Sequence, residues 1–140
     1  MKRTAFGLFT VLLIATAAVS VNAQSIVCPL KVTIPFDFFV GDTVLHHGDY
    51  TVSTLNADGI LVLRGAHDSL TVLTTPSETR GDKNAADKLI FHHVNGEYFL
   101  VSVWTADNSV GYGLFKSRRE REHVAAGAKP ESKVLIANTN

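Results

Sequence analysis

Six histidines are the side chains of this sequence best suited to metal or acid–base chemistry: His46, His47, His67, His92, His93 and His123. A zinc site needs three or four ligands around one ion. Adjacent residues of a strand point to opposite faces of a sheet, so each His-His pair supplies at most one ligand to a given side. We therefore predict no metal site and no cofactor. His92 is expected to be a core or sheet-face histidine whose hydrogen bonds are satisfied locally.

The residue types of a catalytic triad occur consecutively at His67, Asp68 and Ser69. A working triad converges in space from separate elements, which three consecutive residues do not supply. The chain contains no G-x-S-x-G elbow and no phosphate-binding glycine loop. Asp37 stands without the close second carboxylate that glycoside hydrolysis uses. These patterns predict that the protein has no catalytic residues and is not an enzyme.

The start of the chain has the pattern of a secretory signal peptide over residues 1–23. Lys2 and Arg3 precede an apolar run at residues 8–18, and residues 21–23 are small enough for cleavage before Gln24. The apolar run is short for a membrane span, and an uncleaved anchor is the alternative to cleavage. We predict a signal-peptide helix that contacts the membrane only before cleavage, and export to the periplasm or the extracellular space.

Residues 24–140 are expected to form a single domain, since removing the first 23 of 140 residues leaves 117. Cleavage leaves 11 basic and 13 acidic residues. This balance argues against nucleic-acid binding, which needs a basic surface. Cys28 is the single cysteine and is expected to be an inert thiol in a flexible leader, with a link between two chains as the alternative.

The segment 89–104, LIFHHVNGEYFLVSVW, is predicted to be the central hairpin of the fold. Asn95-Gly96 between two β-forming runs is typical of a two-residue type I′ turn. The resulting register pairs Phe91 with Leu100 and makes both faces of the hairpin apolar. Both faces must therefore be covered, by the chain itself, by a partner or by a ligand.

One face of this hairpin is the predicted interaction face, which comprises Phe91, Tyr98, Leu100 and Trp104. A second sheet is the default cover for such a face. The alternatives are a barrel interior that holds an apolar ligand and a surface for self-association or another protein, because aromatic side chains are common at the centres of interfaces.

The rest of the chain reads as short strands separated by turns. Residues 31–40 alternate as a half-buried strand, in which Pro35 indicates an edge or a bulge. Tyr50, in L-x-x-G-x-Y-x-V, is predicted to be a structural tyrosine corner of a Greek-key sandwich. Residues 75–88 are expected to be a mobile loop, with a functional loop as the alternative, and residues 117–122 to begin a solvated surface helix. The fold class is therefore all-β, a Greek-key sandwich or squat barrel of seven to eight antiparallel strands.

Three segments in this order resemble a group of small exported β-rich bacterial proteins that is frequent in acidobacterial proteomes. They are IPFDFFVGDTVLHHGDYTV, the hairpin LIFHHVNGEYFLVSVW and the run KSRRERE. The resemblance implies a secreted β domain and no catalytic activity. The sequence departs from the pattern at His46-His47, where Pro-Ala is usual.

Together these features predict a non-enzymatic, exported structural or protein-interaction module of the bacterial cell envelope. Its partner would be another envelope protein or a second copy of the chain. The alternative function is that of a small β-barrel carrier of an apolar ligand.

Overall fold

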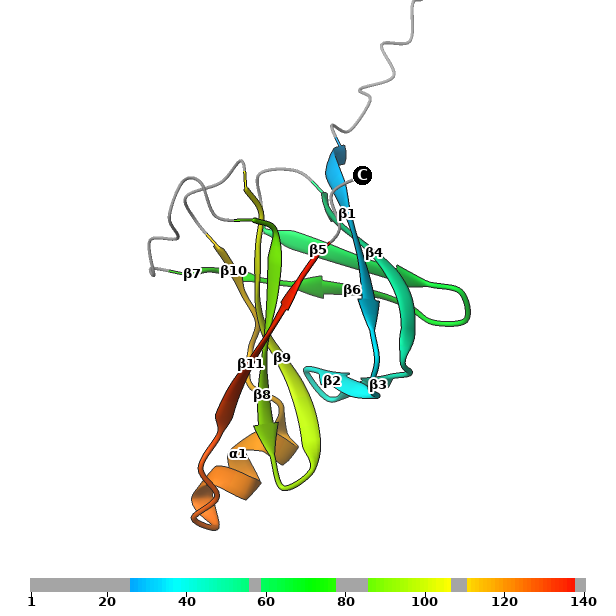
Figure 1. The fold of residues 1–140 in the computed structure, drawn as a ribbon. Coiled ribbons are helices and arrows are strands. Elements are labelled where there is room, and N and C mark those ends of the chain that lie inside the picture. The colour runs from blue at the N-terminus through cyan, green and yellow to red at the C-terminus, as the bar shows by residue number, and fades with distance from the viewer. Residues whose placement is uncertain (1–25, 56–58, 78–85, 107–110, 138–140) are drawn as a thin grey trace, which may run out of the picture.

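The computed structural model describes residues 26–55, 59–77, 86–106 and 111–137 (Figure 1). These residues form an all-β fold of two sheets, one of which curls as a half-barrel, with one short helix. The predicted signal peptide, residues 1–23, lies outside the described residues. Within the described ranges, no helix has the length and apolar character needed to cross a membrane.

Sheet A is antiparallel and has the strand order β1-β4-β5-β6. Its strands are β1 (Ile26–Ile34), β4 (Gly48–Leu55), β5 (Ile60–Gly65) and β6 (Ser69–Leu73). Cys28 therefore lies within a strand and not in a flexible leader. Polar turns separate β4, β5 and β6, which form the meander that their alternation and Gly-containing loops favour.

Sheet B has the order β11-β8-β9-β10-β7. Its strands are β7 (Thr75–Ser77), β8 (Lys88–Val94), β9 (Glu97–Trp104), β10 (Gly111–Gly113) and β11 (Glu131–Ile136). Two further strands, β2 (Phe38–Val40) and β3 (Thr43–Leu45), join it beside β9. The start of the predicted loop 75–88 is thus the strand β7, which pairs with β10; residues 78–85 lie outside the described part of the chain.

The predicted single strand over residues 31–40 is divided between the two sheets at Pro35. Val32 and Ile34 belong to β1 in sheet A, whereas Phe38 and Val40 belong to β2 in sheet B, and all four are buried. Proline lacks the N–H that would continue the ladder. After the bend β2 runs parallel to β9, so the expectation of purely antiparallel pairing is wrong for this pair.

The central hairpin β8–β9 has the predicted turn, in which Asn95 and Gly96 both have positive φ, 50° and 80°. The predicted register holds from Val94↔Glu97 to Phe91↔Leu100. A bulge then shifts the pairing by one residue, so that Leu89 lies opposite Val103 and Lys88 opposite Trp104. One extra residue moves every later side chain to the other face.

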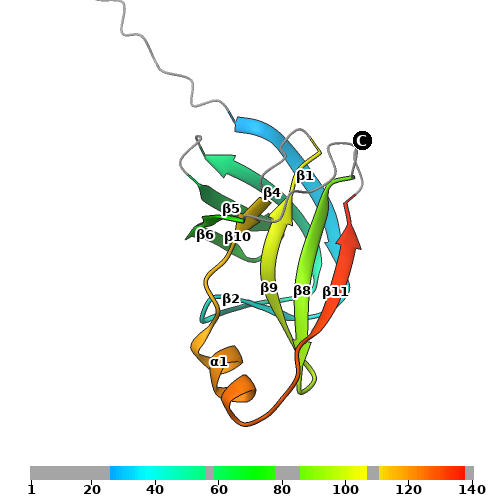
Figure 2. The same ribbon diagram turned by 90° about the vertical axis from the view of Figure 1, so that its left-hand side faces the viewer.

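The core lies between the two sheets, whose strands β5 and β6 run across the direction of β8 and β9 (Figure 1). Leu61 and Leu63 of sheet A and Leu89 and Phe91 of sheet B are completely buried there. Sheet A thus covers the inner face of the central hairpin. The helix α1 (Arg118–Ala125) lies beside the turn end of the same hairpin (Figure 2).

Candidate functional site

The predicted interaction face is not an exposed surface. Phe91 and Leu100 have exposed fractions of 0% and 3% and belong to the core between the sheets. Trp104 is 6% exposed and, because of the bulge in β9, lies on the opposite face of the sheet. It packs there against the backbone of Gly111 on β10. The single face inferred from strict alternation is therefore wrong.

Tyr98, the fourth residue of that predicted face, is half-buried between two other rings. Its ring stacks on Phe36 at a centroid distance of 3.8 Å and on His93 at 4.5 Å. The ammonium of Lys133, on β11, lies 4.8 Å from the Phe36 centroid and 5.1 Å from that of Tyr98. Both faces of the Tyr98 ring are thus occupied by residues of the chain itself.

On the outer face of sheet B, the helix α1 covers the turn end of the hairpin through a buried polar contact. Nδ1 of His92 lies 2.7 Å from Oε1 of Glu120, and the Glu120 side chain is only 2% exposed. A carboxylate accepts hydrogen bonds, so the imidazole nitrogen donates. His92 is therefore a sheet-face histidine whose partner comes from the helix.

The charged run KSRRERE contains the residue that attaches the helix to the hairpin. The prediction that this run forms a solvated surface is therefore wrong for Glu120, which is buried. Ser117 is the N-cap, and its Oγ accepts a hydrogen bond from the N–H of Glu120 at 2.9 Å. Arg118 and Glu122 form an ion pair on the exposed side of the helix, at 2.9 Å. The pattern S-x-x-E, typical of a helix start, is the sequence signal that locates this helix.

A second ionic group ties the helix to the first residue of β9. Glu97 accepts from Arg119 through both carboxylate oxygens, each contact 2.7 Å long, and from His123 Nε2 at 2.8 Å. The guanidinium of Arg119 lowers the pKa of Glu97, and His123 adds to this effect. Bidentate charge-assisted contacts of this kind fix orientation as well as supplying energy.

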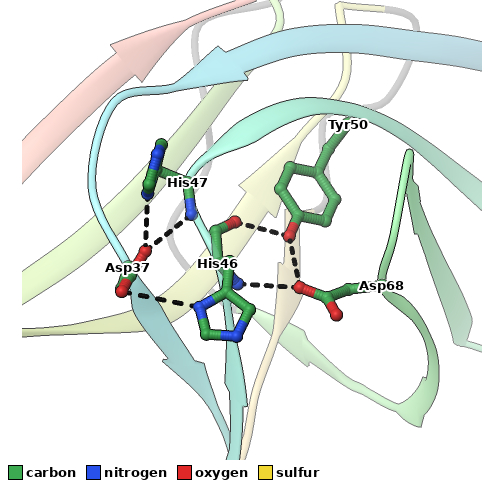
Figure 3. A network of polar contacts seen from close by, with 5 residues as sticks. All are labelled: Asp37, His46, His47, Tyr50 and Asp68. Carbon is green, nitrogen blue, oxygen red and sulfur yellow. Dashed lines mark hydrogen bonds and ion pairs between the residues drawn. The ribbon is translucent and has the colours of Figure 1, made fainter.

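The two adjacent histidines His46 and His47 lie in a polar cluster at the entrance to β4 (Figure 3). Oδ1 of Asp37 accepts from the backbone N–H of His47 at 2.8 Å and lies 2.9 Å from Nδ1 of the same residue. These bonds, the backbone one first, lower the pKa of Asp37 to about 2. Asp37, for which the sequence indicated no role, therefore holds the segment that leads into β4.

Tyr50 completes the polar cluster as a tyrosine corner. Its hydroxyl donates to the carbonyl of His46, four residues upstream, at 2.6 Å. Asp68 accepts from the N–H of His46 at 2.9 Å and lies 3.4 Å from the Tyr50 hydroxyl. Burial, and secondarily the Asp68 charge, raise the pKa of Tyr50 to about 12. The His67-Asp68-Ser69 triplet thus contributes Asp68 to a turn and does not form a triad.

Within the described residues, no three His, Cys, Asp or Glu side chains converge in a way that could hold a metal ion. His92 and His93 point to opposite faces, toward Glu120 and Tyr98 respectively. A hollow of about 430 Å³ is lined by Phe39, Asp42, Arg118, Arg119 and Glu122. Its lining is mostly charged, which does not favour an apolar ligand.

The remaining surface feature of note is an apolar group on the outer face of sheet B, away from α1. It comprises Ile90 of β8 with Val134 and Ile136 of β11, and we call it the outer patch. Val134, directly opposite Ile90, is 50% exposed, and Ile136 is 68% exposed. The apolar run VLI at residues 134–136 does not alternate with polar residues, and this is the sequence signal that both faces of the strand are apolar.

β11 is also a terminal strand of sheet B, and of the strands that the structure describes it pairs with β8 alone (Figure 2). Unpaired backbone groups at such an edge can bond to another strand. The outer patch and this edge therefore form one continuous surface of sheet B.

Comparisons with protein-family models, with curated proteins and with solved structures give no match to this chain.

Proposed function

We propose that the protein is a non-enzymatic, exported structural or interaction module of the bacterial cell envelope. Its contact surface is the outer patch together with the edge of β11. The observation that carries this proposal is the coincidence of exposed Val134 and Ile136 with an edge strand whose outer backbone groups bond to none of the described residues. A strand partner would gain backbone hydrogen bonds and apolar contacts in one place.

The export part of the proposal is supported by the charged, apolar and small-residue pattern of residues 1–23. The resemblance to small exported β proteins of bacteria adds to that support. The non-enzymatic part is supported by the roles of the polar side chains, since Asp37, Asp68 and Glu120 each bond to neighbours that hold the fold.

Site-specific photo-crosslinking in the exporting bacterium tests the contact surface. A photoreactive residue at Ile136 should give discrete crosslinked products at native expression levels. The same residue at Leu73 on β6 is the matched control, because Leu73 is 64% exposed and also lies on a terminal strand. Equal products from both positions, or none from Ile136, would contradict the proposal.

A further inference from the structure

We propose that the edge of β11 pairs with the β11 of a second copy of this chain, antiparallel and centred on Val134, so that sheet B continues through a two-fold axis. This inference rests on the proposed function and names the partner of the same surface.

The backbone groups that would form the pairing are those of Ser132, Val134 and Ile136. Alternate residues of an antiparallel strand direct both N–H and C=O to the same neighbour. The N–H of Ala137 bonds to the carbonyl of Asp87, just before β8, at 2.9 Å. Odd-numbered residues of β11 therefore face β8. The three even-numbered residues direct their N–H and C=O groups to the edge, where no described residue bonds to them.

Two of the other terminal strands, β1 and β7, carry features that block such pairing, and β11 does not. β1 has a bulge between Val27 and Leu30 and contains Pro29. β7 is three residues long and contains Pro76. Natural edge strands are protected by prolines, bulges and short length. β11 has six residues, pairs with β8 without a bulge and contains no proline.

A lysine at the edge of a sheet commonly prevents pairing with another strand. The one lysine of β11, Lys133, does not have this position. The ammonium of Lys133 lies over the rings of Phe36 and Tyr98, on the inner side of the sheet. It is therefore held off the edge by its own chain. The outer side of β11 presents Ser132, Val134 and Ile136, none of which is charged.

The register follows from the symmetry of the pair. Centred on Val134, the antiparallel pairing places Val134 opposite its own copy, Ser132 opposite Ile136 and Lys133 opposite Leu135. Every edge-facing N–H and C=O group then has a partner, and the two outer patches become one. A register centred on Lys133 would place two lysines opposite each other, which is destabilising. The strand is thus complementary to itself, which favours a second copy over an unrelated strand.

Sedimentation equilibrium of the exported, processed protein tests the inference. The protein should show a concentration-dependent monomer–dimer equilibrium. Val134→Pro, which removes one edge-facing N–H, and Ile136→Lys should each weaken dimerisation at least tenfold. Leu73→Lys on β6 is the matched control and should leave it unchanged. Circular dichroism and urea unfolding verify that each variant is folded.

Disulfide trapping tests the register independently. Residues facing each other as a hydrogen-bonded antiparallel pair have Cα atoms about 5.5 Å apart, a separation that a disulfide can span. Val134→Cys in a Cys28→Ser background should form a covalent dimer on mild oxidation, whereas Leu73→Cys in that background should not.

The outcomes separate this inference from the proposed function. A protein that stays monomeric at all concentrations and gives no Val134→Cys dimer overturns self-pairing. If a photoreactive residue at Ile136 nevertheless crosslinks to a different protein in the cell, the proposed function as an interaction module is retained, with that protein as the partner. A dimer that is insensitive to both Val134→Pro and Ile136→Lys overturns the assignment of the interface to β11.

Discussion

Nδ1 of His92 lies 2.7 Å from Oε1 of Glu120, and this contact joins the turn end of the hairpin β8–β9 to the helix α1. The helix therefore covers the turn end of the outer face of sheet B and leaves the β11 end uncovered. The two faces of the hairpin thus have different covers, because sheet A buries the inner face. The outer patch is the part that neither element reaches.

Glu120→Ala should lower the free energy of unfolding by about 3 kcal/mol. The substitution leaves the imidazole of His92 without its hydrogen-bond partner, and the loss of one partner of a buried polar pair is strongly destabilising. Urea unfolding followed by circular dichroism measures this change. Glu122→Ala is the matched control in the same helix, because Glu122 makes an exposed pair with Arg118. Its effect should stay within about 0.5 kcal/mol. Equal losses for both variants would contradict the docking role of Glu120.

The carboxyl of Asp37 should titrate near pH 2 in the folded protein, as measured by NMR of its side-chain carbon. His47→Ala should raise this pKa only in part, because the backbone N–H of His47 has the largest effect and remains. The folded pKa is lower than the ordinary 3.8. The contribution of Asp37 to stability is therefore present above pH 3.8 and lost as the pH falls through about 2. A titration near 3.8 in the unsubstituted protein would contradict the hydrogen bonds between His47 and Asp37.

Local patterns predicted the parts of the fold that neighbouring residues decide. Asn95-Gly96 determined the hairpin turn, and the L-x-x-G-x-Y-x-V spacing located the Tyr50 hydroxyl beside the carbonyl of His46. The all-β class also followed from alternation and turn signals. In each case the physical cause lies within a few residues of the feature, where sequence spacing is informative.

Features that depend on distant segments were not predictable in the same way. The bulge in β9 moved Trp104 to the outer face, and alternation alone gives no signal for an extra residue. Glu120 is buried because His92, 28 residues away, lies beneath it. The open edge of β11 depends on the strand order of sheet B, which one sequence does not reveal.

Gly111→Ala should destabilise the protein by about 2 kcal/mol, because an added Cβ would lie 2.5 Å from Cε2 of the Trp104 ring. Trp104 is the single tryptophan, so its fluorescence emission should also shift to longer wavelength. Gly65→Ala is the matched control, since its Cβ would meet the Tyr50 ring at 2.7 Å. It should destabilise the protein without shifting the emission.

A double-mutant cycle separates this clash from other effects of alanine. Gly111→Ala combined with Trp104→Leu should cost less than the sum of the two single changes, because the smaller side chain leaves room for the Cβ. Additive losses would show that the contact between Trp104 and Gly111 is not the cause.

Tyr50→Phe should lower the free energy of unfolding by about 1 kcal/mol, the net worth of an ordinary hydrogen bond, here the one to the carbonyl of His46. The same substitution should remove the tyrosine ionisation near pH 12 from an ultraviolet titration. Because the pKa of Tyr50 is raised on folding from 10, its contribution to stability is complete below pH 10 and lost as the pH rises through about 12. Asp68→Asn is the comparison variant. It should lower the pKa of Tyr50 only partly, because burial is the larger cause and remains. A full return of the Tyr50 pKa to 10 in Asp68→Asn would instead show that the Asp68 carboxylate causes the shift.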